Sequence, residues 1–419
     1  MEPKSVILGM DLGSTSARAF LWCPGRGPGV IVENKRWKNL GRSEASDFST
    51  SCHPFDDEGP VYVGEEPDPG RQSLSLKYAL YVLADAPDEL LPQCALARPV
   101  LGLEGDRAFR DRLKEGLRQL FATIQQRVSA VCTRKKLRVS TIALSTPALW
   151  EADFTDRYRA VYRAIVADVF AHPSSRICFR TETNALAHYL FTDHLEELPL
   201  DGHRHHVILL LDFGGHSMKG CVLNVVCGDD ETFSFVQKGE DFGTDGGSAH
   251  WDHYVGEMWD GVTSETKQML LLDFNQAKRR GYGCDVTVSC GNEDQFVWRK
   301  VMAAESKRCF EVALCQPLAM AARQIKLVSE MKTTHNCMVI VSGRTTRVDE
   351  LQTTLTSMCN EAGLKNPVFT DSLYGIKNED VNLAIGAAYG AEYESEVRKH
   401  FARLFQTPRP RPADSILRC

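Results

Sequence analysis

The sequence predicts an α/β protein built from two related halves. Strand-like and helical segments alternate along its 419 residues, a pattern typical of sheets covered by helices. Segments 6–22 and 207–223 share one plan: an apolar strand ending in Asp, a Gly-containing turn of small residues, and a second apolar strand. A pattern that occurs twice indicates a duplicated architecture. The length also suits two or three lobes better than a single core.

The first half opens with a β-hairpin. Apolar residues crowd both ends of segment 6–22 and small residues fill its middle, so we expect two strands joined by a tight turn. A third strand is predicted at 30–32, and segment 35–71 is polar enough for loop or edge structure. Helical spacing of apolar residues then predicts two helices, at 74–91 and 108–132, before a strand at 139–145.

The second half repeats this order. A basic and polar interval at 201–206 separates it from the first half. After the second hairpin, helical stretches are predicted at 265–280 and 298–327, followed by a strand at 338–341. The end of the chain, 406–419, is basic and rich in proline, so we expect an extended and disordered tail there.

Composition excludes several classes of protein. Apolar residues make up 43% and charged residues 25%, as in ordinary soluble folded proteins, and no apolar run reaches the length of a membrane span. The net charge is −6 and no basic stripe recurs, so neither nucleic acid nor a membrane is an expected partner. The 14 cysteines include no C-x-x-C pair, which favours buried, reduced thiols over zinc ligands and predicts a cytoplasmic protein.

The two turns have the composition of phosphate-binding loops. Glycine lets backbone N–H groups approach an oxygen closely, and small hydroxyl side chains add donors. The candidates are Gly13, Ser14 and Thr15 in the first turn and Gly214 and Gly215 in the second. Asp11 and Asp212 end the preceding strands and could hold a hydrated Mg²⁺ between the loops. Each turn taken alone is as well explained by a tight β-turn capped by Asp. A Walker-type phosphate loop is absent.

At these residues the chain resembles the actin-like ATPase superfamily, and within it the nucleotide-binding domain of the 70-kDa heat-shock chaperone family. Five motifs occur along the chain in the order typical of the family. In that order they are a first phosphate motif, the segment leading into a first connecting helix, a second phosphate motif, an adenosine motif and a second connecting helix. They are Gly9-Met10-Asp11-Leu12-Gly13-Ser14-Thr15, then 176–190, Leu211-Asp212-Phe213-Gly214-Gly215, Val341-Ser342-Gly343-Arg344-Thr345 and 380–391.

The resemblance implies a two-lobed actin-like ATPase fold with duplicated, ribonuclease H-like lobes and a nucleotide cleft between them. Lobe I would comprise 1–205 completed by 370–405, and lobe II would comprise 206–369. It also implies ATP or ADP and Mg²⁺ as ligands, with Asp11 and Asp212 at the metal.

Other matches to the family rest on single residues or pairs of residues. Lys77 matches the lysine near the attacking water and, with Asp212, would be catalytic; a solvated helix lysine is the alternative. Gly246 and Gly247 match a glycine pair by the γ-phosphate, for which a plain turn is the alternative. The nucleoside would contact the pair Lys278 and Arg279, together with Ser342, Gly343 and Arg344 of the adenosine motif. A charged helix face is the other interpretation of the basic pair.

Departures from the family pattern bear on catalysis. Lys219 replaces a carboxylate of the second phosphate motif. Arg180 stands where the family has a glutamate, although a shifted alignment places Glu182 there. More cations and fewer carboxylates favour holding an anion and disfavour Mg²⁺ binding and water orientation.

The leading hypothesis is therefore an ATP-binding, chaperone-related protein with possible slow hydrolysis, whose nucleotide state a protein partner reads. One alternative is a nucleotide-sensing scaffold without turnover. Another is a sugar-kinase-like phosphotransferase, which shares the duplicated phosphate motifs but lacks a recognisable carboxylate base here. A peptide-binding domain like that of the chaperones is not expected in a chain of this length.

Overall fold

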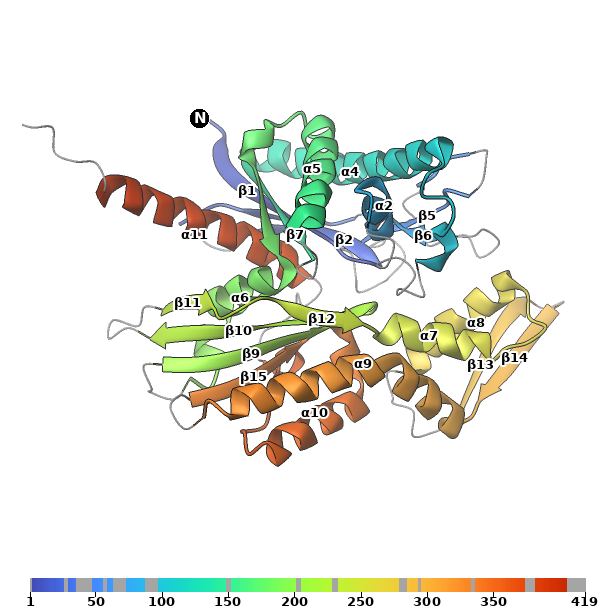
Figure 1. Ribbon diagram of the computed structural model, residues 1–419. Coiled ribbons are helices and arrows are strands. Elements are labelled where there is room, and N and C mark those ends of the chain that lie inside the picture. Colours follow the sequence, from blue (N-terminus) through green and yellow to red (C-terminus); the bar gives the residue numbers. More distant parts are fainter. Residues whose placement is uncertain are drawn as a thin grey trace, which may run out of the picture.

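Two six-stranded sheets organise the molecule. The computed structural model describes residues 2–25, 29–34, 47–55, 59–62, 73–86, 97–147, 152–200, 205–227, 233–278, 285–292, 295–332, 336–373 and 381–404. Within them, the two large sheets lie one above the other, and helices cover their outer faces (Figure 1). The predicted mixed α/β class is confirmed.

The first sheet contains the first predicted hairpin. Its strand order is β3-β2-β1-β7-β8, with β4 pairing β2 beside β3. The hairpin strands β1 and β2 are antiparallel, whereas β7 and β8 run parallel to β1. The strands are β1 (Lys4–Leu12), β2 (Ser16–Trp22), β3 (Val30–Ile31), β4 (Phe48–Ser49), β7 (Leu137–Thr146) and β8 (Ile177–Thr181).

The second sheet repeats this topology strand for strand. Its order is β11-β10-β9-β15-β16, and β12 pairs β10 as β4 pairs β2. The hairpin β9–β10 is antiparallel, while β15 and β16 run parallel to β9. The strands are β9 (His205–Phe213), β10 (Ser217–Cys227), β11 (Phe233–Gln237), β12 (Phe242–Asp245), β15 (Asn336–Ser342) and β16 (Val368–Phe369). The duplication inferred from two hairpins therefore extends to whole sheets.

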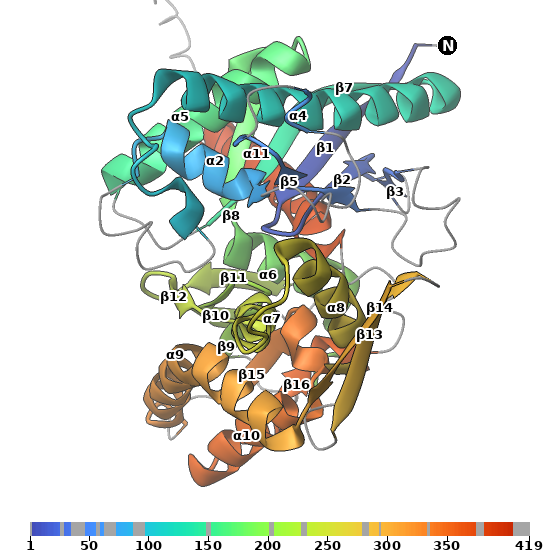
Figure 2. The same cartoon turned by 90° about the vertical axis from the view of Figure 1, so that its right-hand side faces the viewer.

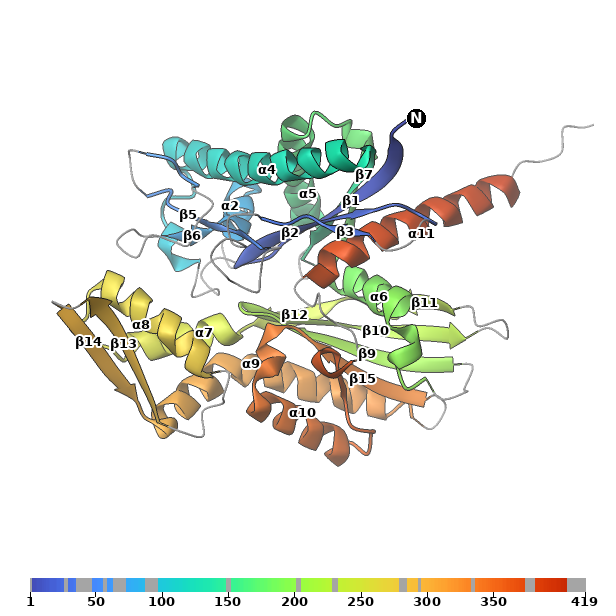
Figure 3. The same ribbon diagram turned by 180° about the vertical axis from the view of Figure 1, so that it is seen from behind.

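Helices of the first half pack on the outer face of the first sheet. They bury the predicted apolar stripes, and their ends are capped: Asp106 accepts the Phe109 N–H at the start of α4, and Ser75 accepts the Lys77 N–H at the start of α2. Figure 3 shows α4 lying across this face. The helices are α2 (Leu76–Leu83), α4 (Arg107–Lys135) and α5 (Ala152–Val169), with a short pair of strands, β5 (Ser51–Cys52) and β6 (Leu74–Ser75), at one end.

The second half carries a larger insertion between β12 and β15. Three helices and a β-hairpin form it, and Figure 2 shows the hairpin beside α8 at the edge of this half. The elements are α7 (Ser248–Glu257), α8 (Ser264–Ala277), β13 (Val286–Asn292), β14 (Gln295–Val301) and α9 (Ala303–Ser329). The helix α10 (Asp349–Glu361) follows β15 and packs beside α9.

Two helices lie between the sheets and join the halves. They are α6 (Glu182–Asp193) and α11 (Asn382–Leu404), which cross each other in the centre of Figure 1. One buried cluster combines both helices with the inner faces of both sheets. Glycine permits the close approach: a Cβ on Gly9 of β1 would lie 1.9 Å from the Ala384 oxygen, and one on Gly386 would lie 1.7 Å from the Ala185 oxygen.

Two predictions from the sequence concern the cysteines and the absence of a membrane-spanning segment. Nine cysteines whose side chains are described are free thiols, and Cys315 is the exposed one among these nine. Within the described part of the chain, no helix combines the length and apolar character that crossing a membrane requires. The predicted tail at 406–419 lies outside the described residues.

Candidate functional site

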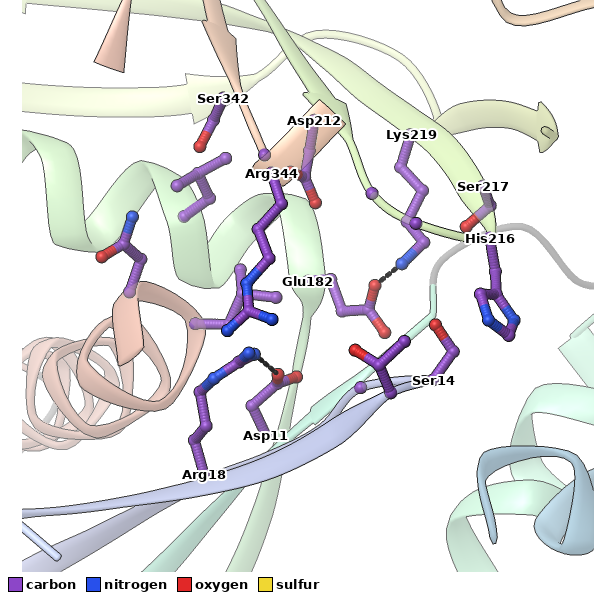
Figure 4. Close-up of a pocket in the computed structure, with 18 of the residues that line it drawn as sticks. Asp11, Ser14, Arg18, Glu182, Asp212, His216, Ser217, Lys219, Ser342 and Arg344 are labelled. Carbon is purple, nitrogen blue, oxygen red and sulfur yellow. Dashed lines mark ion pairs between the residues drawn. The ribbon is translucent and has the colours of Figure 1, made fainter. Parts of the chain in front are cut away.

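A cavity lies where the two hairpin turns approach each other. Its volume is about 120 Å³. Residues from both sheets, from α2, and from the first turns of α6 and α11 line it (Figure 4). The polar lining residues that matter below are Asp11, Gly13, Ser14, Thr15, Arg18, Lys77, Glu182, Asp212, Gly214, Gly215, His216, Lys219, Ser342, Gly343, Arg344, Asp371 and Asn382.

The two turns are built alike. The Gly13 N–H donates to the Ser16 carbonyl at 3.0 Å, and the Gly214 N–H donates to the Ser217 carbonyl at 2.9 Å. Both glycines thus close a turn of the same length between the strands of their hairpins. Further along the first turn, the Thr50 hydroxyl donates to the Ser14 carbonyl at 3.0 Å and fixes the turn against the loop after β4.

Small residues support the second turn from behind. A Cβ on Gly247, whose φ is +159°, would lie 2.3 Å from the Gly214 oxygen, so glycine is needed for this approach. The Ala249 N–H donates to the Gly215 carbonyl at 2.8 Å, and the Thr345 hydroxyl donates to the Gly214 carbonyl at 2.7 Å. These contacts hold the turn in one conformation.

The turns face each other directly. A Cβ placed on Gly215 would lie 4.0 Å from the Thr15 methyl carbon. Beside them, the Tyr78 hydroxyl and the His216 Nδ1 are 2.6 Å apart, and their rings stack. Burial, together with His250 and Lys77, lowers the pKa of His216 to about 3, so this imidazole is neutral at physiological pH. It links α2 of the first half to the second turn.

Each hairpin places a cation opposite its aspartate. In β1 and β2, Asp11 pairs with Arg18, and in β9 and β10, Asp212 pairs with Lys219. Directly opposed residues on antiparallel strands have neighbouring side chains on one face. The Arg18 guanidinium lies 3.7 Å from the Asp11 carboxylate, which also accepts a hydrogen bond from the Ser145 hydroxyl. The duplication thus includes charge: Asp and a basic residue recur at the same interval.

Glu182 connects lysines of the two halves. It is the first residue of α6, where the Thr181 side chain caps the helix and the helix dipole favours a carboxylate. Lys77 Nζ of α2 lies 2.7 Å from its Oε1, and Lys219 Nζ of β10 forms an ion pair with its Oε2. Both lysine side chains are buried, and they share this one carboxylate. Figure 4 shows the ion pair of Lys219 with Glu182.

Burial dominates the ionisation of these groups. It raises the pKa of Asp212 to about 6, with the Asp11 charge acting in the same direction and Lys77 and Arg18 opposing it. It lowers the pKa of Lys77, although Asp11 and Asp212 oppose that shift. Burial and the nearby Lys77 ammonium also lower the pKa of Lys219 well below its usual range. An anion bound beside these amino groups would oppose the lowering of both lysine pKa values.

A carboxylate of the first half bridges two arginines of the cavity. The Arg18 Nε donates to Asp47 Oδ1 at 2.8 Å, and the Arg344 Nη2 donates to Asp47 Oδ2 at 2.8 Å. Arg18 belongs to the first sheet, whereas Arg344 follows β15 of the second. Figure 4 shows the two guanidinium groups pointing toward each other across the cavity. Asp47 therefore ties the halves together at this edge.

The structure brings together most of the residues selected from the sequence. Those that line the cavity are Asp11, Gly13, Ser14, Thr15, Lys77, Asp212, Gly214, Gly215, Ser342, Gly343 and Arg344. Gly246 and Gly247 lie behind the second turn instead. Lys278 is not a lining residue: its ammonium bonds to the Ser248 carbonyl and pairs with Asp252. Arg279 lies outside the described residues.

Several site residues were missed or left open at the sequence level. Arg18 was not selected, although it occupies the position in the first hairpin that Lys219 occupies in the second. Of the two residues considered for the family glutamate, Glu182 lines the cavity, while Arg180 donates to the Gly390 carbonyl at 2.9 Å. Asn382, at the start of α11, had no local signal; its buried Oδ1 has no hydrogen-bond partner among the described residues.

The donor set fits Mg²⁺ poorly. Magnesium binds through one or two carboxylates with waters and phosphates. Here Asp11 lies beside Arg18, Asp212 lies opposite Lys219, and Glu182 is held by two lysines. Among the described residues, no group of three or more His, Cys, Asp and Glu side chains could hold a metal ion. The magnesium site expected at Asp11 and Asp212 stays a prediction, and its surroundings are unfavourable to a divalent cation.

No protein-family model matches the chain, and no curated protein matches it.

Proposed function

We propose that this chain binds an adenine nucleotide, ATP or ADP, between its two halves, and that these halves are the lobes of an actin-like ATPase fold related to the 70-kDa heat-shock chaperones. One observation carries the proposal: two hairpin turns of equivalent construction face each other across a single cavity that basic side chains from both halves enter. The equivalent topology of the two sheets supports the fold part of the proposal.

The turns and basic groups suit a phosphate chain. Glycine-rich turns present N–H groups to phosphate oxygens, and Lys and Arg supply charge-assisted hydrogen bonds. In the proposed complex Gly13 to Thr15 and Gly214-Gly215 lie on either side of the phosphates. Lys77 and Lys219 supply the positive charge between them.

The opposite end of the cavity suits a nucleoside. The unpartnered Asn382 Oδ1 is an acceptor that a ribose hydroxyl or an exocyclic amine could satisfy. Ser342 and Arg344 of the expected adenosine motif line the same end. The planar Arg344 guanidinium can stack on a base. Lys278 has no part in this proposal, because it does not line the cavity and its ammonium is held by Asp252 and the Ser248 carbonyl.

Binding requires the halves to move apart. The cavity of about 120 Å³ is smaller than ligand pockets in general, which hold roughly 300–1,000 Å³. The contacts that cross it, such as Tyr78–His216 and Asp47–Arg344, have to yield or rearrange as the ligand enters. Separation of the halves is thus the conformational signal that a protein partner could read.

We favour binding without turnover over hydrolysis. A carboxylate that orients an attacking water must be free to accept its proton. Glu182 is held by Lys77 and Lys219, and the Lys77 ammonium is itself in that ion pair. Slow hydrolysis assisted by Lys77 and Asp212 is the alternative. A single-turnover measurement separates them, since phosphate release above the buffer background would support the ATPase alternative.

The binding site can be tested by filling the gap between the turns. Gly215→Val is a suitable change, because the nearest atom to a Cβ at this position is 3.7 Å away, which is an ordinary van der Waals contact. The valine methyl groups would occupy the phosphate position, so we expect affinity for ATP and ADP to fall at least about tenfold by calorimetry, with an unchanged melting temperature.

Gly105→Val is the matched control, because a Cβ at Gly105 meets no atom within 4 Å and lies on a turn before α4. Equal affinities of the wild type and Gly215→Val would place the nucleotide elsewhere. Absence of ATP and ADP binding by the wild type would remove the proposed function.

A further inference from the structure

The resemblance to the chaperone family implies Mg²⁺ at Asp11 and Asp212, yet basic side chains also line the cavity. The two hairpins differ from a pair of metal-binding carboxylates in the same way: each Asp has a basic residue directly opposite it on the neighbouring strand. Arg18 cannot lose its charge, because the guanidinium stays protonated in proteins. A divalent cation between Asp11 and Asp212 would therefore lie close to fixed positive charge.

The lysine pair adds the second observation. Lys77 and Lys219 come from different halves, lie buried at the cavity, and converge on the single carboxylate of Glu182. Glu182 thus offers a single carboxylate to two buried amino groups. A buried ammonium needs an anionic partner. A phosphate oxygen in the cavity would give each lysine a partner of its own.

We propose that the site binds the polyphosphate chain of its nucleotide without a divalent metal, with Lys219, Lys77 and Arg18 supplying the charge that magnesium supplies in metal-dependent sites. This inference rests on the proposed function. It assigns Lys219 a phosphate-binding role. In the metal-dependent arrangement that the resemblance implies, a carboxylate at position 219 would serve the metal.

Binding measurements with and without metal test this directly. ATP, ADP and inorganic tripolyphosphate are titrated into the intact chain by calorimetry, once in excess EDTA and once in excess Mg²⁺. We expect each affinity in EDTA to equal or exceed that in Mg²⁺, because the metal screens the phosphates from the lysines. Affinity should also fall with rising salt concentration, as it does for contacts between phosphates and basic side chains.

Variants at position 219 sharpen the test. Lys219→Met keeps the length of the side chain and removes its charge, so ATP affinity in EDTA should fall about tenfold or more. Lys219→Asp should make binding depend on Mg²⁺. Lys300→Met is the matched control, since this exposed lysine of β14 pairs with Asp285 far from the cavity. Thermal melting establishes that each variant is folded; if Lys219→Asp does not fold, the Met variant alone decides.

The possible outcomes separate this inference from the proposed function. ATP binding that is measurably tighter in Mg²⁺ than in EDTA would overturn metal-free binding and leave nucleotide binding intact. Tripolyphosphate binding in EDTA without ATP binding would retain the phosphate site and overturn the nucleotide proposal. If none of the three ligands binds, both fail. Unchanged EDTA affinity in Lys219→Met would exclude Lys219 from the phosphate site.

Discussion

Asp212 shows how burial at a single residue changes the charge of the cavity. Its carboxylate is surrounded by Asp11, Lys77, Arg18 and the opposed Lys219, and burial is the largest influence on it. Its pKa rises from 3.8 to about 6. The native state therefore binds this proton more tightly than the unfolded chain does, and the ionised form at neutral pH destabilises the fold.

A pH series with Asp212→Asn tests this assignment. As pH rises from about 4 to 6, the unfolded chain loses the proton first, so the wild type should lose stability relative to Asp212→Asn across this interval. Urea unfolding at several pH values measures the difference. The difference should be constant below the pKa of the unfolded state, change between the two pKa values, and be constant again above about 6.

The control for that series has the opposite sign. Lys300 lowers the pKa of the exposed Asp285, so Asp285→Asn should remove stability that the wild type has above the unfolded pKa and loses in acid. A pH-independent difference between the wild type and Asp212→Asn would show that the carboxyl of Asp212 is not perturbed.

At the scale of elements, the crossing of α6 and α11 positions the site. Glu182 begins α6 and Asn382 begins α11, so both reach the cavity only if these helices keep their places between the sheets. Gly386 permits the crossing, because a Cβ there would lie 1.7 Å from the Ala185 oxygen. A backbone carbonyl within a helix cannot move aside as a flexible side chain can.

Gly386→Ala should therefore force the helices apart. We expect a loss of unfolding free energy of about 3 kcal/mol, at the upper end for overpacked cores. The same variant should weaken ATP binding, because the displaced α6 carries Glu182. Gly105→Ala, with open space around its Cβ, should change stability by less than about 0.5 kcal/mol. Equal urea midpoints for the two variants would contradict the packing argument.

At the scale of the whole molecule, Asp47 links the two halves, and in the proposed complex it would compete with the nucleotide. It holds Arg18 of one half and Arg344 of the other, each at 2.8 Å. Both arginines line the cavity, so the carboxylate occupies them as an anionic ligand would. Opening the halves for a nucleotide has to break this contact.

Asp47→Asn should loosen the molecule and tighten binding. The variant keeps the shape of the side chain and loses its charge, so unfolding free energy should fall by about 1–3 kcal/mol. ATP affinity should rise a few-fold, because the arginines become available and opening costs less. Calorimetry and urea unfolding measure the two effects.

The comparison for Asp47→Asn is Asp85→Asn, which removes an exposed carboxylate that pairs with Arg110 within the first half. It should leave ATP affinity unchanged and alter stability by at most about 0.5 kcal/mol. A fall in ATP affinity for Asp47→Asn would mean that Asp47 organises the arginines for the ligand instead of competing with it.

Many of the strands and helices could be predicted from local sequence patterns. Alternating apolar residues around Gly13 and Gly214 predict two hairpins, because strand periodicity and turn chemistry depend on a few neighbouring residues. The helices α2 and α4 follow from apolar spacing in the same way. The insertion hairpin β13–β14 was not predicted, and the helix expected at 298–327 begins only at Ala303, because residues 298–301 belong to β14. Lys278 was placed at the nucleoside by resemblance alone, and the fold engages it elsewhere.

The sequence by itself determined that the protein has two strand-turn-strand units, each with an Asp and a glycine turn, because those features are local. Only the tertiary structure decided which charges meet. Lys77 and Glu182 are 105 positions apart, and Asp47 and Arg344 are 297 apart. Such pairs depend on how the sheets stack and how α6 and α11 cross between them, and no local pattern encodes that arrangement. The pairing of the cavity's basic side chains with the protein's own carboxylates is therefore a property of the assembled fold.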